Sequence, residues 1–347
     1  MRSIRLTSPE PLELDDSTII EGDVHFALSR LPSSSVQCVV TSPPYWGLRD
    51  YGITGQIGLE PTLPGFLQAL TGVFSEVKRV LRPDGVLWLN IGDGYTSGNR
   101  GWRAPDKKNP NRAMTTRPDN PPGLKDKDLM GIPWRLAFAL QDTGWYLRSD
   151  IVWNKPNAMP ESVKDRPTRA HEYLFMLTKS QNYRYDAEAV RELAAGGQMR
   201  NRRSVWNINT TNSPSSHIAA FPQALVEPCV LASTGVGDFV LDPFFGSGTV
   251  GMVCNRLGRR YVGIELNSSY IEEAATFLQI PRVRTNGSRR QNSDYETAPA
   301  LLESPGKFGN GPGNLPEDLP STGAVPSNKK YRSHAAESRA TKVRARK

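Results

Sequence analysis

The segment DFVLDPFFGSGTVG, residues 238–251, constrains the fold of this 347-residue chain more than any other feature. A β-rich apolar run ends at Asp242, small residues at 246–248 allow a tight turn, and a helical pattern begins at Thr249. The next apolar run, RYVGIEL, reaches Glu265, 17 residues after Gly248. Strand, turn, helix and strand in this order predict a βαβ unit and therefore an α/β fold.

The same rhythm continues through the rest of the chain. SVQCVVT from Ser35 and VLWLNIG from Val86 predict buried strands on either side of a helix over 64–81, with a turn at 83–85. A helix over roughly 131–143, strands at DIVWNK and EYLFMLTK, and a helix from about Ser268 complete the pattern. We therefore expect a Rossmann-like architecture with a mixed, mostly parallel sheet.

Composition suggests boundaries around this pattern. We expect a loose leader at residues 1–17, one folded domain over 18–282, and a disordered tail over 283–347, where Gly, Pro, Ser and Asn dominate. Within the domain, residues 94–130 read as a basic loop with eight Lys or Arg against four Asp. Residues 157–216, which have little periodicity overall and many Arg, Asn, Ser and Thr, read as an insert.

The net charge of +8 lies mostly at one end of the chain. Residues 326–347 carry eight basic side chains and one acid, so they hold +7 and leave +1 for residues 1–325. This tail either adds salt-dependent affinity for phosphates or is a solvated end, and both interpretations stay open. Any nucleic-acid surface on the folded part must come from local clustering of charge.

Several classes of protein are disfavoured. No apolar run approaches the ~18 residues of a membrane span, and the first residues lack the apolar stretch of a secretory signal. Cys38, Cys229 and Cys254 each lie among apolar residues without metal-ligand spacing, and the four histidines form no cluster. We expect reduced core thiols, no metal site and a cytoplasmic location.

The residues around the glycine turn fit one kind of cofactor. Glu265 at a strand end can hold both hydroxyls of a ribose, and Asp242 before the turn suits a cationic amino group. The free amides at the helix start suit a carboxylate. The lysine of a triphosphate loop is missing, and the glycine spacing departs from G-x-G-x-x-G. This combination predicts S-adenosylmethionine, whereas the alternative is a glycine turn needed only for packing.

A second motif, TSPPYW at residues 41–46, follows the predicted strand SVQCVVT. Pro43 and Pro44 fix the loop, so that the Ser42 hydroxyl and the Pro43 carbonyl can accept hydrogen bonds from an exocyclic amine. Withdrawal of those hydrogens localises the nitrogen lone pair for attack on a sulfonium methyl. Tyr45 offers a flat face on which an extruded base can stack. An isolated S-P-P-Y could equally be an ordinary loop with a buried Tyr.

Together, TSPPYW and DPFFGSGT resemble the amino-directed DNA methyltransferases, which modify cytosine N4 or adenine N6. The resemblance covers about residues 20–280 and includes Gly22-Asp23 before the first strand, GLRDYG (47–52), GQIGLE (55–60), the stretch 153–180 and HIAAFP (217–222). The catalytic loop precedes the cofactor loop, which matches the permuted β-type order of motifs. The resemblance thus implies an S-adenosylmethionine-dependent methyltransferase fold with circularly permuted motif order, a catalytic domain over 18–282 and target recognition in 157–216.

The resemblance also implies roles for individual residues. The expected cofactor contacts are Asp23 at the adenine edge, and Asp242, Phe244, Gly246, Gly248, Thr249, Glu265, His217, Phe221 and Pro222. Trp153 and Lys155 are expected beside the target base, although Trp153 reads equally well as a core residue. The other expected contacts to DNA or the target base are Trp46, Arg166, Arg169, Arg200, Arg202 and Arg203.

The expected activity is direct transfer to the N4 amine of a flipped cytosine, because Ser42 is typical of N4 enzymes; adenine N6 is the alternative. Pro228-Cys229 resembles the nucleophile motif of carbon-5 methyltransferases, but an amine needs no covalent adduct, so we interpret Cys229 as packing. Double-stranded DNA is the expected partner; a cognate restriction endonuclease, and a monomeric or homodimeric state, are left open. An RNA or protein-glutamine methyltransferase, a dehydrogenase and a non-catalytic DNA-binding protein are the other hypotheses.

Overall fold

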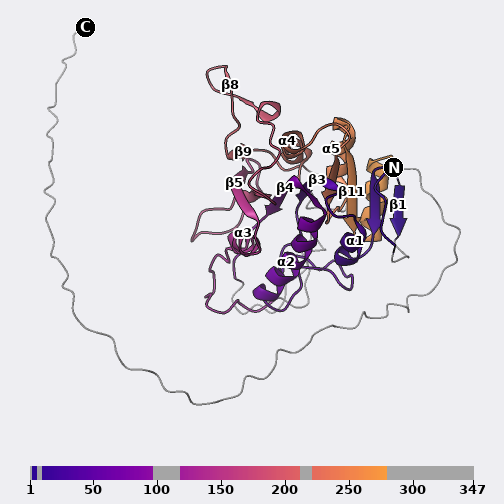
Figure 1. The fold of residues 1–347 in the computed structure, drawn as a ribbon. Helices are drawn as coiled ribbons and strands as arrows, with labels where there is room; N and C mark the ends of the chain where they lie inside the picture. Colours follow the sequence, from indigo (N-terminus) through magenta and orange to yellow (C-terminus); the bar gives the residue numbers. More distant parts are fainter. Residues whose placement is uncertain (1, 6–9, 97–117, 212–220, 280–347) are drawn as a thin grey trace, which may run out of the picture. The chain divides into compact units, whose positions relative to one another are not determined.

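A computed structural model describes residues 2–5, 10–96, 118–211 and 221–279 (Figure 1). Nine of the described strands form one mixed sheet in the order β1-β2-β11-β10-β3-β4-β6-β5-β9. Their bounds are β1 Arg2–Arg5, β2 Thr18–Glu21, β3 Val36–Thr41, β4 Leu81–Ile91, β5 Tyr146–Asn154, β6 His171–Thr178, β9 Val205–Asn207, β10 Phe239–Asp242 and β11 Arg260–Glu265. The pairs from β1 to β4 are parallel, β6 runs antiparallel to both of its neighbours, and β9 is parallel to β5.

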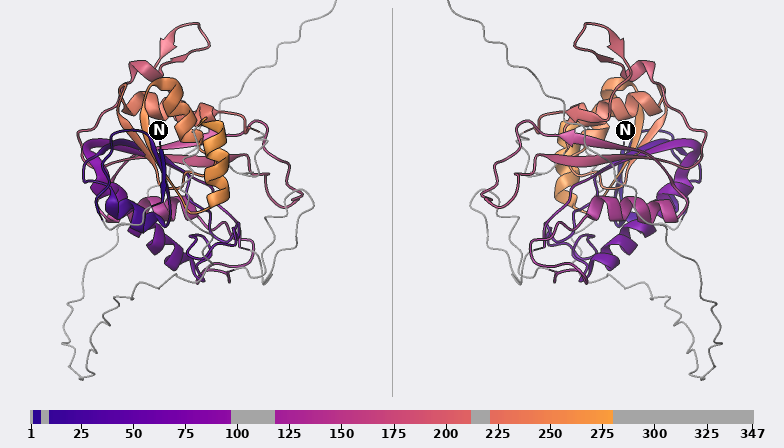
Figure 2. Two further views of the ribbon diagram at one scale, coloured as in Figure 1. Left: turned by 90° about the vertical axis from the view of Figure 1, so that its right-hand side faces the viewer. Right: turned by 90° about the vertical axis from the view of Figure 1, so that its left-hand side faces the viewer.

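Helices cover both faces of the sheet (Figure 2). On one face lie α1 (Val24–Arg30), α2 (Leu63–Val80) and α3 (Ile132–Asp142); on the other lie α4 (Gln223–Ser233), α5 (Thr249–Leu257) and α6 (Ser268–Phe277). Side chains alternate between these faces along each strand. In β3, Val39 packs with the α1–α3 cluster, whereas Cys38 and Val40 pack with the α4–α6 cluster. The predicted α/β class with a mixed, mostly parallel sheet is therefore confirmed.

The predicted helices form where capping and apolar spacing direct them. The Thr62 side chain caps α2 by accepting a hydrogen bond from Gly65 N at 3.2 Å, and Phe66, Leu70 and Val73 recur at helical spacing on its buried face. The predicted helix over 64–81 is thus α2. The regions predicted as strands at SVQCVVT, VLWLNIG, DIVWNK and EYLFMLTK all contribute to the sheet.

Four expectations about the organisation were wrong or incomplete. Part of the supposed leader, Arg2–Arg5, is the edge strand β1, and Gly22-Asp23 follow β2 rather than preceding the first strand. The expected turn at 83–85 lies inside β4, where the register with β3 shifts. The range 157–216 is not a separate insert, because β6 lies in the middle of the sheet and β9 extends its edge.

Within residues 157–216, one short hairpin is separate from the sheet. It is formed by β7 (Glu192–Leu193) and β8 (Met199–Arg200), follows the 3-10 helix η2 (Glu188–Val190), and projects from the sheet (Figure 1). Most of the basic loop 94–130 and the tail 283–347 lie outside the described residues. Within the described part of the chain, no helix combines the length and apolarity needed to cross a bilayer.

The glycine at position 263 lets the loop after β10 pack onto β11. Phe245 is 3% exposed, its backbone N–H donates to Ile264 O at 2.9 Å, and its ring stacks on Tyr261 with centroids 5.5 Å apart. A Cβ on Gly263 would overlap the Phe245 ring. A residue without a side chain is therefore required beneath this loop.

Gly263→Ala should destabilise the fold by about 1–3 kcal/mol, because the Phe245 ring is buried and has no room to move. Chemical denaturation of the purified chain measures this. Gly196→Ala is the matched control, since a Cβ there meets nothing within 4 Å. Equal midpoints for wild type and Gly263→Ala would contradict the packing described here.

Candidate active site

A cavity of about 470 Å³ opens where the parallel strands end. Its walls come from the segments that follow β2, β3, β10 and β11, and from β5 and β6 opposite them. The wall residues among those predicted from the sequence are Asp23, Ser42, Pro43, Pro44, Tyr45, Trp153, Lys155, Arg169, Phe221, Phe244, Gly246 and Glu265. Open α/β sheets bind their ligands at this edge of the strands.

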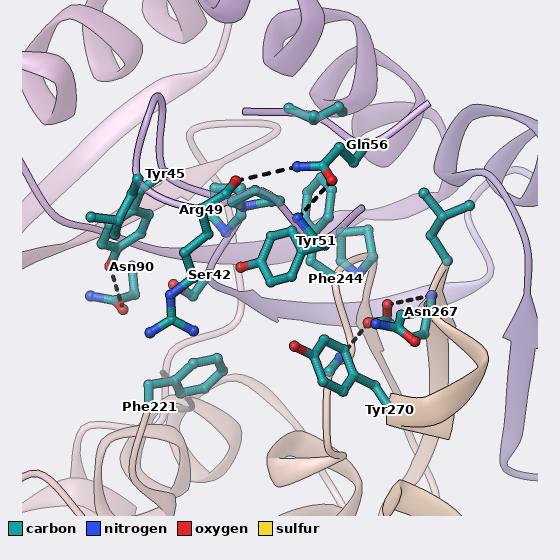
Figure 3. A pocket seen from close by; sticks show the side chains of 18 of the residues that line it. Ser42, Tyr45, Arg49, Tyr51, Gln56, Asn90, Phe221, Phe244, Asn267 and Tyr270 are labelled. Carbon is teal, nitrogen blue, oxygen red and sulfur yellow. Dashed lines mark hydrogen bonds between the residues drawn. The ribbon is translucent and has the colours of Figure 1, made fainter. Parts of the chain in front are cut away.

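Glu265 lies in the cavity wall next to Asn267, and Figure 3 labels Asn267 and Tyr270 at this end of the cavity. The Oε2 of Glu265 accepts from Gly246 N at 2.8 Å, and its Oε1 accepts from Asn267 N at 2.8 Å. Burial raises the pKa of Glu265, and the two backbone donors oppose that shift. Each carboxylate oxygen can accept a further hydrogen bond. Tyr51 and Tyr270 pack edge to face beside it at 6.2 Å, so this end suits a polar ring such as a ribose next to aromatic surface.

Asp23 also lies in the cavity wall, but part of its side chain is engaged. It is the N-cap of α1, and its Oδ1 accepts from Phe26 N at 3.0 Å. The second carboxylate oxygen can still accept from a ligand amine. Its predicted place near the cofactor end is compatible with this geometry.

Asp242 is placed differently from the prediction. It is 1% exposed and lies behind the wall, where its Oδ1 accepts from Thr41 Oγ1 at 2.7 Å and from Phe244 N at 3.1 Å. Burial raises the pKa of Asp242 to about 7. Its observed role is to join β3 to the loop after β10. We therefore correct the expectation that it faces a ligand's amino group directly.

Two amides of the glycine turn that precedes α5 are also engaged. Gly246 N–H donates to Glu265, and Gly248 N–H donates to Phe245 O at 3.0 Å. Gly248 (φ 87°) and Thr249 are outside the cavity wall, as is Pro222, the N-cap of α4. The expectation that this helix start holds a carboxylate is thus not supported. Of the predicted cofactor contacts, His217 lies outside the described residues.

The SPPY loop occupies the other end of the cavity. The Tyr45 hydroxyl donates to Glu172 Oε2 at 2.7 Å and lies 3.5 Å from Asn90 Oδ1, while Lys155 Nζ pairs with Glu172 Oε1. Burial raises the pKa of Tyr45 well above its usual value, and the Glu172 charge adds to the shift. The Tyr45 side chain approaches the backbone closely enough that a Cβ on Gly92 would lie 2.7 Å from its ring. The Tyr45 ring is therefore held in one orientation, and its hydroxyl stays protonated.

Glu172 and Asn90 were not predicted as functional residues. Asn90 lies within the apolar strand run VLWLNIG and Glu172 is the first residue of EYLFMLTK, so a polar residue in an apolar run is the only unusual signal. Asn90 Nδ2 donates to Tyr173 O at 3.1 Å, which orients its carbonyl oxygen toward Tyr45. A polar side chain inside a buried strand run could have marked these positions.

The aromatic and basic residues predicted to contact a target base divide into two groups. Trp153 is 3% exposed and donates to Ile208 O at 2.8 Å, yet it still forms part of the wall, with Lys155 Nζ 4.2 Å above its ring. Arg169 lies in the wall, and its Nη1 has no hydrogen-bond partner among the described residues. These three residues are brought to the SPPY end.

The remaining predicted contacts lie elsewhere. Trp46 is a core residue, 6% exposed, whose indole donates to Glu60 O at 2.8 Å, so its assignment to DNA was wrong. Arg166 pairs with Glu161 at 2.7 Å, and Arg200 pairs with Glu192 at 2.8 Å. Arg202 lies over the Trp206 ring at 4.5 Å, and Arg203 is exposed. None of these four arginines is in the cavity wall.

Cys229 is buried within α4, where its Sγ donates to Leu225 O at 3.2 Å. Burial raises the pKa of its thiol far above the usual value. It is outside the cavity wall, and Cys38 and Cys254 are likewise free and buried. The predicted packing role of Cys229 agrees with this placement, since a nucleophilic cysteine needs access and a lowered pKa.

The sequence of this chain is similar to those of known proteins. The family N6_N4_Mtase, described as DNA methylase, matches residues 36–276. Type II methyltransferase M.XycI of Xanthomonas campestris pv. cyanopsidis is 70% identical over 275 residues, which are 79% of this chain and 92% of that protein. Type II methyltransferase M.Cfr9I of Citrobacter freundii is 68% identical over 275 residues, which are again 79% of this chain and 92% of that protein.

Two solved structures share the fold. The PvuII DNA methyltransferase (cytosine-N4-specific) superposes with a TM-score of 0.57 at 21% identity, covering 79% of this chain and 89% of that one. TTHA0409, a putative DNA modification methylase from Thermus thermophilus solved with S-adenosyl-L-methionine, gives a TM-score of 0.51 at 27% identity, covering 75% and 92%. The expected methyltransferase fold is confirmed.

The raised pKa of Asp242 predicts a pH-dependent stability. The folded state keeps this carboxyl protonated up to about pH 7, whereas the unfolded chain releases the proton near its usual pKa of 3.8. Stability should therefore fall by on the order of 4 kcal/mol as the pH rises from about 4 to about 7, and level off above that. Asp242→Asn should remove this part of the decline in urea unfolding measured across the range.

Asp186→Asn is the control, because that carboxylate is exposed and caps only a short 3-10 helix. Its profile should run parallel to that of the wild type. A profile for Asp242→Asn that is also parallel would contradict the raised pKa.

Proposed function

This chain belongs to the N6_N4_Mtase family of DNA methylases, and from that premise we propose that it methylates the exocyclic N4 amine of a cytosine in duplex DNA with S-adenosylmethionine as donor. The observation that carries the proposal is a single cavity with Glu265 at one end and the Ser42–Tyr45 loop at the other. A donor and an acceptor can meet there without leaving the protein.

The residues at the Glu265 end fit the cofactor. Both oxygens of Glu265 are fixed by backbone donors and keep lone pairs for two ribose hydroxyls. Phe221 and Phe244 supply apolar wall beside it. When bound, S-adenosylmethionine supplies a methyl group on a positively charged sulfur. TTHA0409, solved with this cofactor, has the same fold, which supports the assignment.

At the other end, the chain prepares an amine for attack. The Ser42 hydroxyl and Pro43 carbonyl accept its two hydrogens and so concentrate the lone pair on nitrogen. Tyr45 presents its ring to the base, and Glu172 fixes that ring through the hydroxyl. No thiol reaches the cavity from the described residues, so transfer is direct and forms no covalent enzyme intermediate.

The choice of cytosine rests on Ser42 and on the donors around the SPPY end. On its Watson–Crick edge cytosine carries two acceptors, N3 and O2, beside the amine hydrogens, whereas the same edge of adenine carries one, N1. Lys155 and Arg169 provide cationic donors in this part of the wall, and Arg169 Nη1 is unpaired within the described chain. This supply of donors favours cytosine, and adenine N6 is the second candidate because its amine would use the same acceptors.

The proposed substrate is double-stranded DNA with the target base flipped out. A base in a duplex cannot reach a cavity of this kind while stacked, and flipping costs a few kcal/mol. Both relatives named above are Type II methyltransferases, which supports a place beside a cognate restriction endonuclease. Transfer of a labelled methyl group to duplex DNA, with RNA and a glutamine-containing peptide as alternative acceptors, tests the proposal; labelling of RNA or peptide but not of DNA would overturn it.

Ser42→Ala should lower the turnover number by about 10- to 100-fold, because one acceptor of the amine hydrogens is lost. The cofactor end is untouched, so the Kd for S-adenosylmethionine should stay close to that of the wild type. Steady-state kinetics and calorimetry measure the two quantities. Full activity of this variant would show that the hydroxyl is not an acceptor in the reaction.

Cys229→Ser should keep most of the activity, since a hydroxyl can replace the thiol donor to Leu225 O and the residue is remote from the cavity. Initial rates on duplex DNA, with circular dichroism to verify folding, are the measurement. A correctly folded but inactive Cys229→Ser would point to a thiolate mechanism instead.

A further inference from the structure

Arg49 is a buried cation in the cavity wall. It belongs to the GLRDYG segment after the SPPY loop, and only 9% of it is exposed. Its guanidinium contacts the Tyr51 hydroxyl, but its Nε has no hydrogen-bond partner and the side chain forms no ion pair with any residue that the structure describes. An enclosed charge without a counter-charge is unfavourable unless a ligand completes it.

The loop that carries Arg49 is well fixed. Gly47 N donates to Gly58 O at 2.8 Å, Gln56 Oε1 accepts from Tyr51 N at 2.8 Å, and Gln56 Nε2 donates to Arg49 O at 3.3 Å. Figure 3 shows the Arg49 side chain extending from this loop into the cavity in the direction of Phe221. The backbone is thus anchored while the guanidinium is presented to the cavity, a preorganised arrangement for binding.

The position of Arg49 favours a small anion that enters with a ligand. A DNA phosphate follows the backbone outside the cavity and would not reach a side chain with 9% exposure. A flipped cytosine or adenine is neutral. The methionine part of S-adenosylmethionine carries a carboxylate, and the guanidinium matches a carboxylate in geometry and charge.

The helix start that was predicted to hold that carboxylate does not present itself to the cavity. Gly246 N–H and Gly248 N–H donate within the protein, and Thr249 is outside the cavity wall. Tyr51 and Tyr270 both lie within electrostatic range of Arg49 and of Glu265. Figure 3 shows the guanidinium near Ser42 and Phe221, so it lies between the SPPY loop and the ribose site, toward which the methionine part of the cofactor would extend.

We infer that Arg49 binds the α-carboxylate of S-adenosylmethionine and is a cofactor-binding residue of this chain. The inference rests on the proposed function. The guanidinium and carboxylate then form a charge-assisted pair inside the cavity, and the carboxylate separates the cation of Arg49 from the sulfonium. Binding of the complete cofactor relieves the cost of the buried charge, whereas a ligand without the carboxylate leaves it unrelieved.

Calorimetry without DNA tests this with two probes, S-adenosylmethionine and its decarboxylated form. Wild type should bind the first about 10- to 100-fold more tightly, the effect of a charge-assisted hydrogen bond. Arg49→Gln should lose most of that preference, and it should bind the decarboxylated probe at least as well as the wild type does. Arg49→Lys should retain part of the preference, because it keeps the charge without the planar fork.

Arg148→Gln is the matched control, since that arginine contacts Tyr183 outside the cavity wall; it should keep the full preference. Equal weakening of both probes by Arg49→Gln would mean that Arg49 only supports the loop, and an unchanged preference would mean that it binds something else. Either result would overturn this inference and leave the proposed function standing. Failure of the wild type to bind S-adenosylmethionine would instead overturn the proposed function.

Discussion

One buried hydrogen bond holds the two halves of the site together. Thr41 Oγ1, at the end of β3, donates to Asp242 Oδ1, at the end of β10, across 201 positions of the sequence. The SPPY loop begins directly after the donor, and the segment that leads into the glycine turn begins directly after the acceptor. The distance between catalytic loop and cofactor loop is therefore set by a contact inside the sheet, and both loops depend on it.

The chemistry of the cavity follows from which polar groups are satisfied within the chain and which are not. Tyr45 and Glu172 are paired, so the aromatic face has a fixed place. Glu265 is held by two amides but keeps acceptor capacity. Arg49 and Arg169 carry donors without partners in the described chain. Groups fixed by the protein position the ligands, and the groups left open bind them.

Much of the fold could be predicted from the sequence, because apolar periodicity and turn residues act locally. The strands β3, β10 and β11 and the helices α2, α3 and α5 lie where those patterns place them. The short strands β1 and β2 were not predicted; β10 is equally short, but the glycine turn that follows it marks its end, and no such signal follows β1. The assignment of 157–216 as an insert failed because β6 is held at the centre of the sheet by pairing with distant strands.

The site itself was predictable only in part. Ser42, Tyr45, Glu265 and Phe221 follow recognisable motifs and do reach the cavity. Glu172 and Arg49 were missed, since their importance arises from tertiary contacts and from a missing partner, neither of which is visible in the sequence. Trp46 was misassigned for the converse reason: an aromatic residue next to a catalytic motif looks functional until its indole is found bonded to Glu60 O.

Direct transfer of a methyl group to an exocyclic amine of DNA leaves a modified nucleoside that identifies the reaction. The decisive experiment is to methylate duplex DNA with the purified chain, digest it to nucleosides and analyse them by mass spectrometry. We expect N4-methylcytosine as the new nucleoside. N6-methyladenine would contradict the choice of base, and 5-methylcytosine would contradict the mechanism, because a ring carbon needs the covalent thiolate intermediate that the buried Cys229 cannot provide.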